Sequence, residues 1–124
     1  MRVTVRRSMT GSVQAVWDVL TDLDAWPAWG PSVRGARLDD ATELATGVTG
    51  TVTTAIGLPL PFTITTFRPG KEWAWRVAGV PAISHGVTTD DRGTVAWMSA
   101  PVWAPAYLPV LALALRRIDD LTRP

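Results

Sequence analysis

One histidine and one tyrosine are the residues of this chain best suited to acid–base chemistry or to anchoring a ligand. His85 lies in an alternating segment, residues 82–89, where Ile83, His85 and Val87 share one face. Because imidazole titrates near neutral pH, His85 could be a general acid or base, a hydrogen-bond anchor, or a neutral core residue satisfied by a neighbour. Tyr107, at the start of a predicted helix, could present its hydroxyl to a cavity or stand at the cavity mouth.

Other common catalytic arrangements are absent from the sequence. Ser84 precedes His85 and therefore points to the opposite strand face, which excludes a Ser–His pair from these two residues. The chain contains no cysteine, so thiolate nucleophiles and thiolate metal ligands are excluded. Asp18, Asp22 and Asp24 lie near predicted helix ends, where capping explains them. We therefore assign no catalytic residue beyond the candidates His85 and Tyr107, and we expect no metal and no cofactor.

Seven tryptophans in 124 residues are the most unusual feature of the composition. Each is a large apolar plate with one N–H donor, and such plates can fill a core or line a cavity. Alternation places Trp73 and Trp75 on one face of residues 72–78, and Trp97 on the apolar face of residues 94–99. We predict that these three line the concave side of a sheet. Trp17 and Trp103 are expected to be packing residues, whereas Trp26 and Trp29, beside Pro27 and Gly30, are expected to fix the short-helix turn at one end of the cavity.

Changes in the hydrophobic period divide the chain into the elements that position these side chains. Residues 2–9 alternate and are rich in β-branched residues, which predicts a strand. Apolar residues at 13, 16, 17 and 20 predict a short amphipathic helix capped by Ser12, and a second short helix runs towards Trp29. Short turns separate the runs that follow, as is typical of an antiparallel meander. These six predicted strands span residues 33–39, 48–55, 62–67, 72–78, 82–89 and 94–99.

A long helix is predicted after Pro101, where the period returns to that of a helix. Its apolar face consists of Ala104, Leu108, Leu111, Leu115 and Ile118. Asp119 and Asp120 are expected on a solvated last turn among arginines. This helix offers the only long apolar surface able to cover the sheet face that carries the large apolar side chains. The residues predicted to line a cavity between them are Trp73, Trp75, His85, Trp97, Tyr107, Phe62, Ile64, Ile83, Leu108 and Leu111.

Composition and charge limit the classes of partner. The length of 124 residues fits one domain, residues 1–124, and the net charge is +1 with no long basic run, which argues against nucleic acid. The longest apolar stretch, residues 102–115, is shorter than the roughly 20 residues of a membrane span. With no apolar run like that of a signal peptide near the start, we expect a cytoplasmic protein without integral membrane contact. The sequence leaves the oligomeric state open, a homodimer included.

Several segments resemble a known family. Residues 16–22 (Val-Trp-Asp-Val-Leu-Thr-Asp) and 26–31 (Trp-Pro-Ala-Trp-Gly-Pro) are similar to the start of the polyketide cyclase/dehydrase branch of the START/Bet v 1-like (SRPBCC) superfamily. Residues 66–76 and 91–97 resemble its later hairpins, so the resemblance spans essentially the whole chain. It implies an α+β helix-grip fold: a curved, seven-stranded antiparallel sheet, two short helices and a long C-terminal helix. Members use the enclosed cavity for sterols, lipids, polyketides or plant hormones, but the resemblance carries no reaction.

Three functions follow from this cavity. The first is intracellular binding of an apolar small molecule, namely a lipid, a polyketide or an aromatic compound. The second is a polyketide aromatase/cyclase or dehydratase, which needs an acid or base near the reacting carbon. The third is a protein-interaction domain whose cavity is filled by tryptophans. A cavity under about 150 Å³ would favour the third function, since ligand pockets usually start near about 300 Å³.

Overall fold

The structure is a computed structural model that describes residues 2–101 and 105–124. Two residues of the sequence predictions, Trp103 as a packing residue and Ala104 as part of the helical stripe, lie outside the described residues. In the described ranges, no helix is both long and apolar enough to cross a bilayer.

Seven antiparallel strands form one sheet in the order β1-β7-β6-β5-β4-β3-β2. Hairpins join the strands from β2 to β7, while the N-terminal strand β1 pairs with β7 at the far edge. The fold predicted from the sequence, including the antiparallel meander, is confirmed. The strands are β1 (Arg2–Ser8), β2 (Val33–Leu38), β3 (Thr49–Thr54), β4 (Pro59–Arg68), β5 (Glu72–Val77), β6 (Val80–Asp90) and β7 (Gly93–Pro101).

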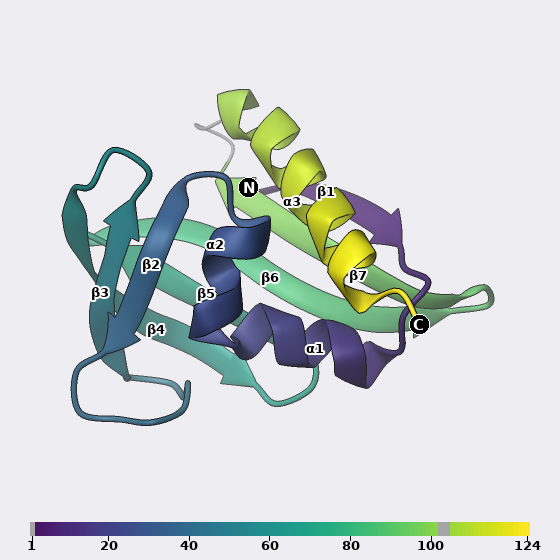
Figure 1. The fold of residues 1–124 in the computed structure, drawn as a ribbon, viewed down its shortest axis with the longest axis horizontal. Helices are drawn as coiled ribbons and strands as arrows, with labels where there is room; N and C mark the ends of the chain where they lie inside the picture. Colours follow the sequence, from purple (N-terminus) through teal and green to yellow (C-terminus); the bar gives the residue numbers. More distant parts are fainter. Residues whose placement is uncertain (1, 102–104) are drawn as a thin grey trace.

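The helices lie together on one face of this sheet (Figure 1). They are α1 (Val13–Thr21), α2 (Trp26–Trp29) and α3 (Leu108–Thr122), with short 3-10 helices at Leu23–Ala25 and Pro105–Tyr107. Ser12 caps α1 because its side chain accepts a hydrogen bond from the amide of Ala15. Pro27 is tolerated because it lies in the first turn of α2, where its missing N–H would have no partner.

Irregular strand pairing bends the sheet around the helices. The register shifts by one residue between β4 and β5 near Thr66, and again between β5 and β6 near Ala74. Such bulges bend a strand and increase its local twist. The sheet is therefore concave on the side that faces α3.

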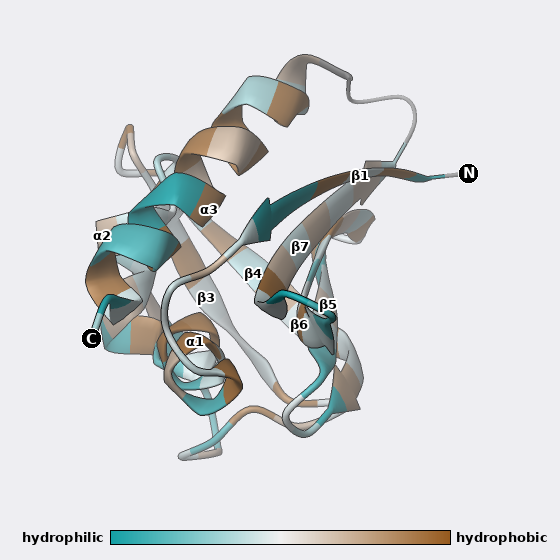
Figure 2. Cartoon of the chain, turned by 90° about the vertical axis from the view of Figure 1, so that its right-hand side faces the viewer, coloured by the Kyte–Doolittle hydropathy of each residue, from teal (hydrophilic) through white to brown (hydrophobic). Residues whose placement is uncertain are grey.

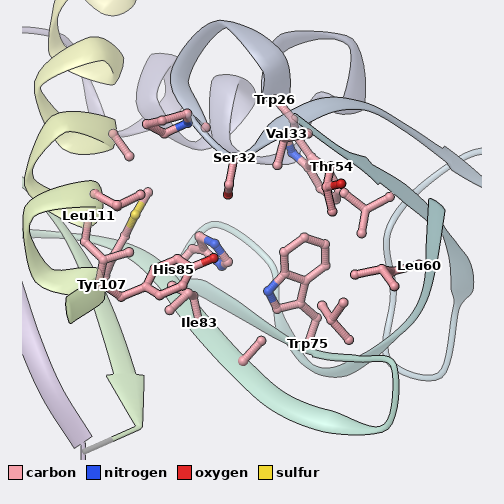
Figure 3. Close-up of a pocket in the computed structure, with 18 of the residues that line it drawn as sticks. Trp26, Ser32, Val33, Thr54, Leu60, Trp75, Ile83, His85, Tyr107 and Leu111 are labelled. Carbon is pink, nitrogen blue, oxygen red and sulfur yellow. The ribbon is translucent and has the colours of Figure 1, made fainter. Parts of the chain in front are cut away.

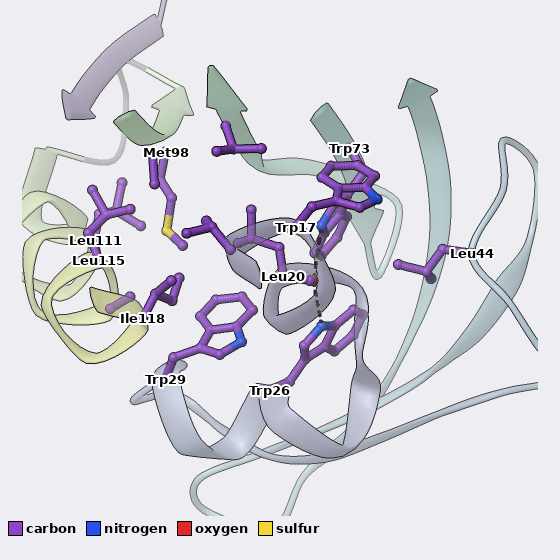
Figure 4. Packing of buried hydrophobic residues seen from close by; sticks show 14 of the residues in the cluster. Trp17, Leu20, Trp26, Trp29, Leu44, Trp73, Met98, Leu111, Leu115 and Ile118 are labelled. Atoms are coloured by element: carbon purple, nitrogen blue, oxygen red, sulfur yellow. Dashed lines mark hydrogen bonds between the residues drawn. The ribbon is translucent and has the colours of Figure 1, made fainter. Parts of the chain in front are cut away.

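The hydrophobic core fills the space between this concave face and the helices (Figure 4). Leu111, Ala114, Leu115 and Ile118 of α3 are buried in it, whereas the hydrophilic residues of α3 gather in its C-terminal half (Figure 2). Most of the apolar face predicted for this helix is thus correct.

Three buried indoles are fixed to the end of α1. Trp26 and Trp73 both donate from Nε1 to the carbonyl oxygen of Leu20, at 3.0 and 3.2 Å (Figure 4). Trp29 donates to the carbonyl oxygen of Val19 at 3.1 Å. Carbonyls in the last turn of a helix have no partner within the helix. The indoles supply those partners, so packing and hydrogen bonding fix α1 and α2 against β5 together.

The prediction for Asp119 was wrong. Its side chain is buried rather than solvated, because Oδ2 accepts hydrogen bonds from Arg7 of β1 and Oδ1 accepts them from Thr10. Asp120, the adjacent residue, is exposed as expected.

Candidate ligand-binding cavity

A cavity of about 540 Å³ lies between the concave sheet, α2 and α3. Its inner wall is formed by buried residues, among them Trp26, Trp29, Trp73, His85, Met98 and Leu111. Its rim consists of exposed side chains: Ile56, Leu58, Val80 and Tyr107. The cavity is therefore closed at the core and open to solvent at one end of the sheet.

The close-up in Figure 3 shows which elements surround this space. Tyr107 and Leu111 approach from the start of α3, and Thr54 and Leu60 lie on the opposite side, in β3 and β4. His85 and Trp75 lie between them, from the neighbouring strands β6 and β5.

His85 is held inside a cluster of aromatic rings. Its imidazole is stacked on the indole of Trp73, with centroids 3.9 Å apart, and meets Trp29 and Trp75 edge-on. This contact arises because His85 and Trp73 are direct neighbours on paired strands and share the concave face. The Nδ1 atom lies 3.4 Å from the carbonyl oxygen of Trp73. Only a protonated Nδ1 can pair with a carbonyl, so Nε2 is the acceptor nitrogen of the neutral ring.

Burial keeps the imidazole neutral. Loss of hydration lowers the pKa of His85 from 6.5 to about 3, and the positive charge of Arg2 adds to this effect. The contact with the Trp73 carbonyl acts in the opposite direction but is outweighed. At neutral pH, His85 therefore offers the cavity a hydrogen-bond acceptor and not a positive charge.

Trp75 differs from the other indoles around the cavity. Its ring packs edge-on against Trp26, Trp73 and Phe62. Its Nε1 is buried yet has no hydrogen-bond partner among residues 2–101 and 105–124. In Figure 3 the indole nitrogen lies on the ring edge turned towards the open space. A polar atom of this kind needs an explanation, because most buried donors in proteins are paired.

The remaining polar groups of the lining are neutral. Ser32 and Thr54 contribute hydroxyls, and Tyr107 stands at the mouth with 41% of its surface exposed. Within the described ranges, no Asp, Glu, Lys or Arg lines the cavity. The same part of the chain holds no group of three His, Cys, Asp or Glu residues able to bind a metal ion.

Six of the ten predicted lining residues do line the cavity: Trp73, Trp75, Ile83, His85, Tyr107 and Leu111. Phe62 and Ile64 are instead core residues, since Phe62 packs against the rings of Trp26 and Trp75 and Ile64 is fully buried. Leu108 packs against the core, because the helical positions turned to the cavity are 107, 110, 111 and 114. For those three residues the predicted position was wrong.

The sheet face predicted for Trp97 was also wrong. Trp97 pairs with Gly86 across β6 and β7, whereas the adjacent pair, His85 and Met98, faces the cavity. The indole of Trp97 therefore lies on the convex face, directly against Gly86, where the absence of a side chain leaves room for it. Alternation had correctly grouped Trp97 with Val95 but had assigned the pair to the wrong side.

One wall of the cavity was not predicted. Val33, Val52 and Thr54 of β2 and β3 line it, together with Val110 and Ala114 of α3. The available signal was the alternation of Val52 with its threonine neighbours in β3. This alternation places an apolar side chain on one face of the strand and two polar side chains on the other.

An antiparallel sheet that curves around a long C-terminal helix, with an apolar cavity between the two, defines the helix-grip fold of Bet v 1-like proteins. The sequence matches the family described as polyketide cyclase/dehydrase and lipid transport over residues 1–118, and the chain belongs to that family. No curated protein is significantly similar in sequence.

Solved structures share the fold at low sequence identity. An uncharacterized protein of Bacillus thuringiensis has a TM-score of 0.74 at 13% identity, with each chain fully covered. A protein of Nitrosomonas europaea has a TM-score of 0.73 at 17% identity, covering 98% of this chain and 93% of the other. The Aha1 protein of Colwellia psychrerythraea, described as a dimer, has a TM-score of 0.71 at 18% identity and covers 99% and 96%.

Proposed function

We propose that the protein binds a neutral, largely apolar small molecule in the cavity between the sheet and α3. The observation that carries this proposal is the cavity itself: about 540 Å³, apolar, and closed at its inner end. Ligand sites typically measure about 300–1,000 Å³ and combine apolar walls with a few polar groups. The volume also argues against a cavity filled by tryptophans, and thus against the protein-interaction alternative.

Binding is favoured over acid–base catalysis by the state of His85. A general base is most effective when its pKa lies near the working pH. With a pKa of about 3, His85 has little tendency to take a proton from a substrate at neutral pH. Its lone pair can still accept a hydrogen bond, which is a role in binding.

The family description names polyketides and lipid transport. A lipid, a polyketide or an aromatic compound therefore remains the expected ligand class. Native mass spectrometry of freshly purified protein would reveal a co-purified molecule of this kind. A homodimer is a separate expectation, since the Colwellia protein is described as a dimer, and analytical ultracentrifugation tests it.

A blocked cavity provides the decisive test of binding. Ala114 is a buried lining residue of α3, and Ala112 is an exposed residue of the same helix. Ala114→Trp should abolish binding of naphthalene, measured by equilibrium dialysis, while Ala112→Trp should leave it unchanged. Val110→Trp, at a half-buried lining position, gives a second blocked variant if Ala114→Trp does not fold. Equal naphthalene binding by wild type and a folded blocked variant would overturn the proposal.

A further inference from the structure

Two polar atoms of the cavity wall are left without partners, and they are of opposite kind. Trp75 Nε1 is a buried donor, and it is the single buried side-chain nitrogen or oxygen that lacks a partner within the described part of the chain. The indoles of Trp26, Trp29 and Trp73 all donate to backbone carbonyls. Leaving a buried donor unpaired costs free energy, so Trp75 is the exception that a ligand would satisfy.

His85 supplies the matching acceptor. Its Nδ1 is directed at the carbonyl of Trp73, which leaves the lone pair of Nε2, and Nε2 makes no hydrogen bond to any described residue. The stacking on Trp73 fixes the plane of the imidazole, so the direction of this lone pair is fixed as well.

The two rings are close enough to share one polar atom. Their centroids lie 6.0 Å apart, and the planes meet at 71°. A hydroxyl oxygen that makes two hydrogen bonds of about 2.9 Å at a roughly tetrahedral angle bridges two nitrogens about 4–5 Å apart, a separation compatible with this arrangement of the rings. Figure 3 shows both rings bordering the same open space.

The chemistry of this pair selects among polar groups. A hydroxyl both donates and accepts, so it can donate to His85 Nε2 while accepting from Trp75 Nε1–H. A carbonyl or ether oxygen only accepts and leaves His85 without a partner. A carboxylate would place a charge in a lining that contains no Lys or Arg among the described residues, which is unfavourable.

We propose that Trp75 and His85 form a hydroxyl-recognition site, and that the ligand is an apolar alcohol or phenol whose hydroxyl bridges the two side chains. This inference rests on the proposed function, because it assigns the polar group of the ligand that the cavity binds. The apolar part of the molecule then extends along Val52, Leu60 and Leu111 towards the mouth.

Three probes of nearly equal shape test this site: naphthalene, 2-methoxynaphthalene and 2-naphthol. They carry no polar group, an acceptor only, and a donor plus acceptor. Each hydrogen bond formed should tighten binding by about 3- to 10-fold. In equilibrium dialysis, wild type should bind 2-methoxynaphthalene more tightly than naphthalene by one such factor, and 2-naphthol by two.

Variants assign each factor to one side chain. Trp75→Phe should remove the advantage of 2-methoxynaphthalene over naphthalene, and His85→Phe should reduce 2-naphthol to the level of 2-methoxynaphthalene. Trp97→Phe is the matched control, because Trp97 lies on the convex face outside the cavity, and it should change none of the ratios. Naphthalene measures any change of cavity shape within each variant.

The outcomes separate this inference from the proposed function. If wild type binds naphthalene and 2-naphthol equally, or if both variants keep the wild-type ratios, the hydroxyl site is overturned while apolar binding stands. If none of the three probes binds to wild type, the proposed function fails and this inference with it. Should His85→Phe not fold, the wild-type series and Trp75→Phe still decide the result.

Discussion

The imidazole of His85 is stacked on the indole of Trp73, with the ring centroids 3.9 Å apart and the planes 17° from parallel. The stack removes the imidazole from water and leaves only 3% of the residue exposed. A protonated imidazole is poorly stabilised in such surroundings, since its hydration is lost and Arg2 adds a positive charge. The stack therefore links the protonation of a single side chain to the stability of the fold.

Folding should become weaker in mild acid because of this link. The unfolded chain takes up a proton on His85 below pH 6.5, whereas the folded protein, with a pKa of about 3, does not. The free energy of unfolding should fall by about 1.4 kcal/mol per pH unit in that window, or about 2 kcal/mol between pH 6.5 and 5. Urea denaturation at these pH values measures the loss.

His85→Phe provides the reference for this measurement. His85 is the only histidine, so the variant should show a much smaller change between pH 6.5 and 5, where few carboxylates titrate. Well above pH 6.5 the effect should vanish, because both states are then neutral at this residue. A wild-type stability that is constant from pH 7 to pH 5 would contradict the burial of a neutral imidazole.

Helix α3 should be indispensable for folding through its buried face. Leu111 is 4% exposed, and an unpaired carboxylate at that position would cost several kcal/mol, comparable with the roughly 5–15 kcal/mol that stabilises a typical domain. The Leu111→Asp variant should therefore give the circular dichroism spectrum of an unfolded chain. Leu113→Asp, two residues away and 38% exposed, should change stability by only about 0.5 kcal/mol. A folded Leu111→Asp variant with the wild-type melting temperature would refute this role of α3.

The sequence predicted the elements well because their signals are local. The change from alternation to helical period marks α1 and α3, and the turns between them mark the hairpins. The inward positions of Trp73, Trp75 and His85 followed from alternation within a strand. Whether these side chains bind a ligand remains a prediction.

Which face of the sheet a side chain occupies is not determined by local sequence, and this is why Trp97 was predicted on the wrong face. Alternation groups Trp97 with Val95 but does not say which group is concave. The decision depends on the pairing of β7 with β6, where Trp97 meets Gly86 on the convex side. A glycine opposite a tryptophan was the one sequence clue, and it becomes informative only once the register is known.

Gly86 should be intolerant of even a methyl group. A Cβ at this position would overlap the indole of Trp97, and such overpacking typically costs about 1–3 kcal/mol. Gly86→Ala should lower the free energy of unfolding by that amount in urea denaturation. Gly35→Ala, where a Cβ would meet no atom within 4 Å, is the control and should change stability by about 0.5 kcal/mol at most.

A second substitution tests the cause. In a Trp97→Leu background, the same Gly86→Ala change should cost less, because the indole that it meets is gone. Equal costs in both backgrounds would show that Trp97 is not the obstacle.

Asp119, whose predicted environment was also wrong, shows the same limitation. Near the end of a charged helix, a carboxylate is usually solvated, and its sequence neighbours are arginines. Two of its partners, Arg7 and Thr10, are more than 100 residues away in sequence and come close only when β1 pairs at the edge of the sheet next to α3. Long-range hydrogen bonds of this kind leave no periodic signal.

Asp119 should be the most important carboxylate for stability among those described here. Burial alone would raise its pKa, but the hydrogen bonds from Thr10 and Arg7 outweigh burial and hold the pKa below its ordinary value of 3.8. Asp119→Ala removes the acceptor and leaves the Thr10 amide without its partner, so we expect a loss of about 2–4 kcal/mol at pH 7. Asp120→Ala, at an exposed neighbouring position, should cost about 0.5 kcal/mol or less.

Because the folded pKa of Asp119 is depressed, the advantage of wild type over Asp119→Ala should be complete well above pH 3.8 and should decline as the pH falls below it. Urea denaturation of the three proteins at pH 7 and pH 3 measures both effects, and equal stability of the two variants at pH 7 would show that the contacts of Asp119 do not hold α3 to β1.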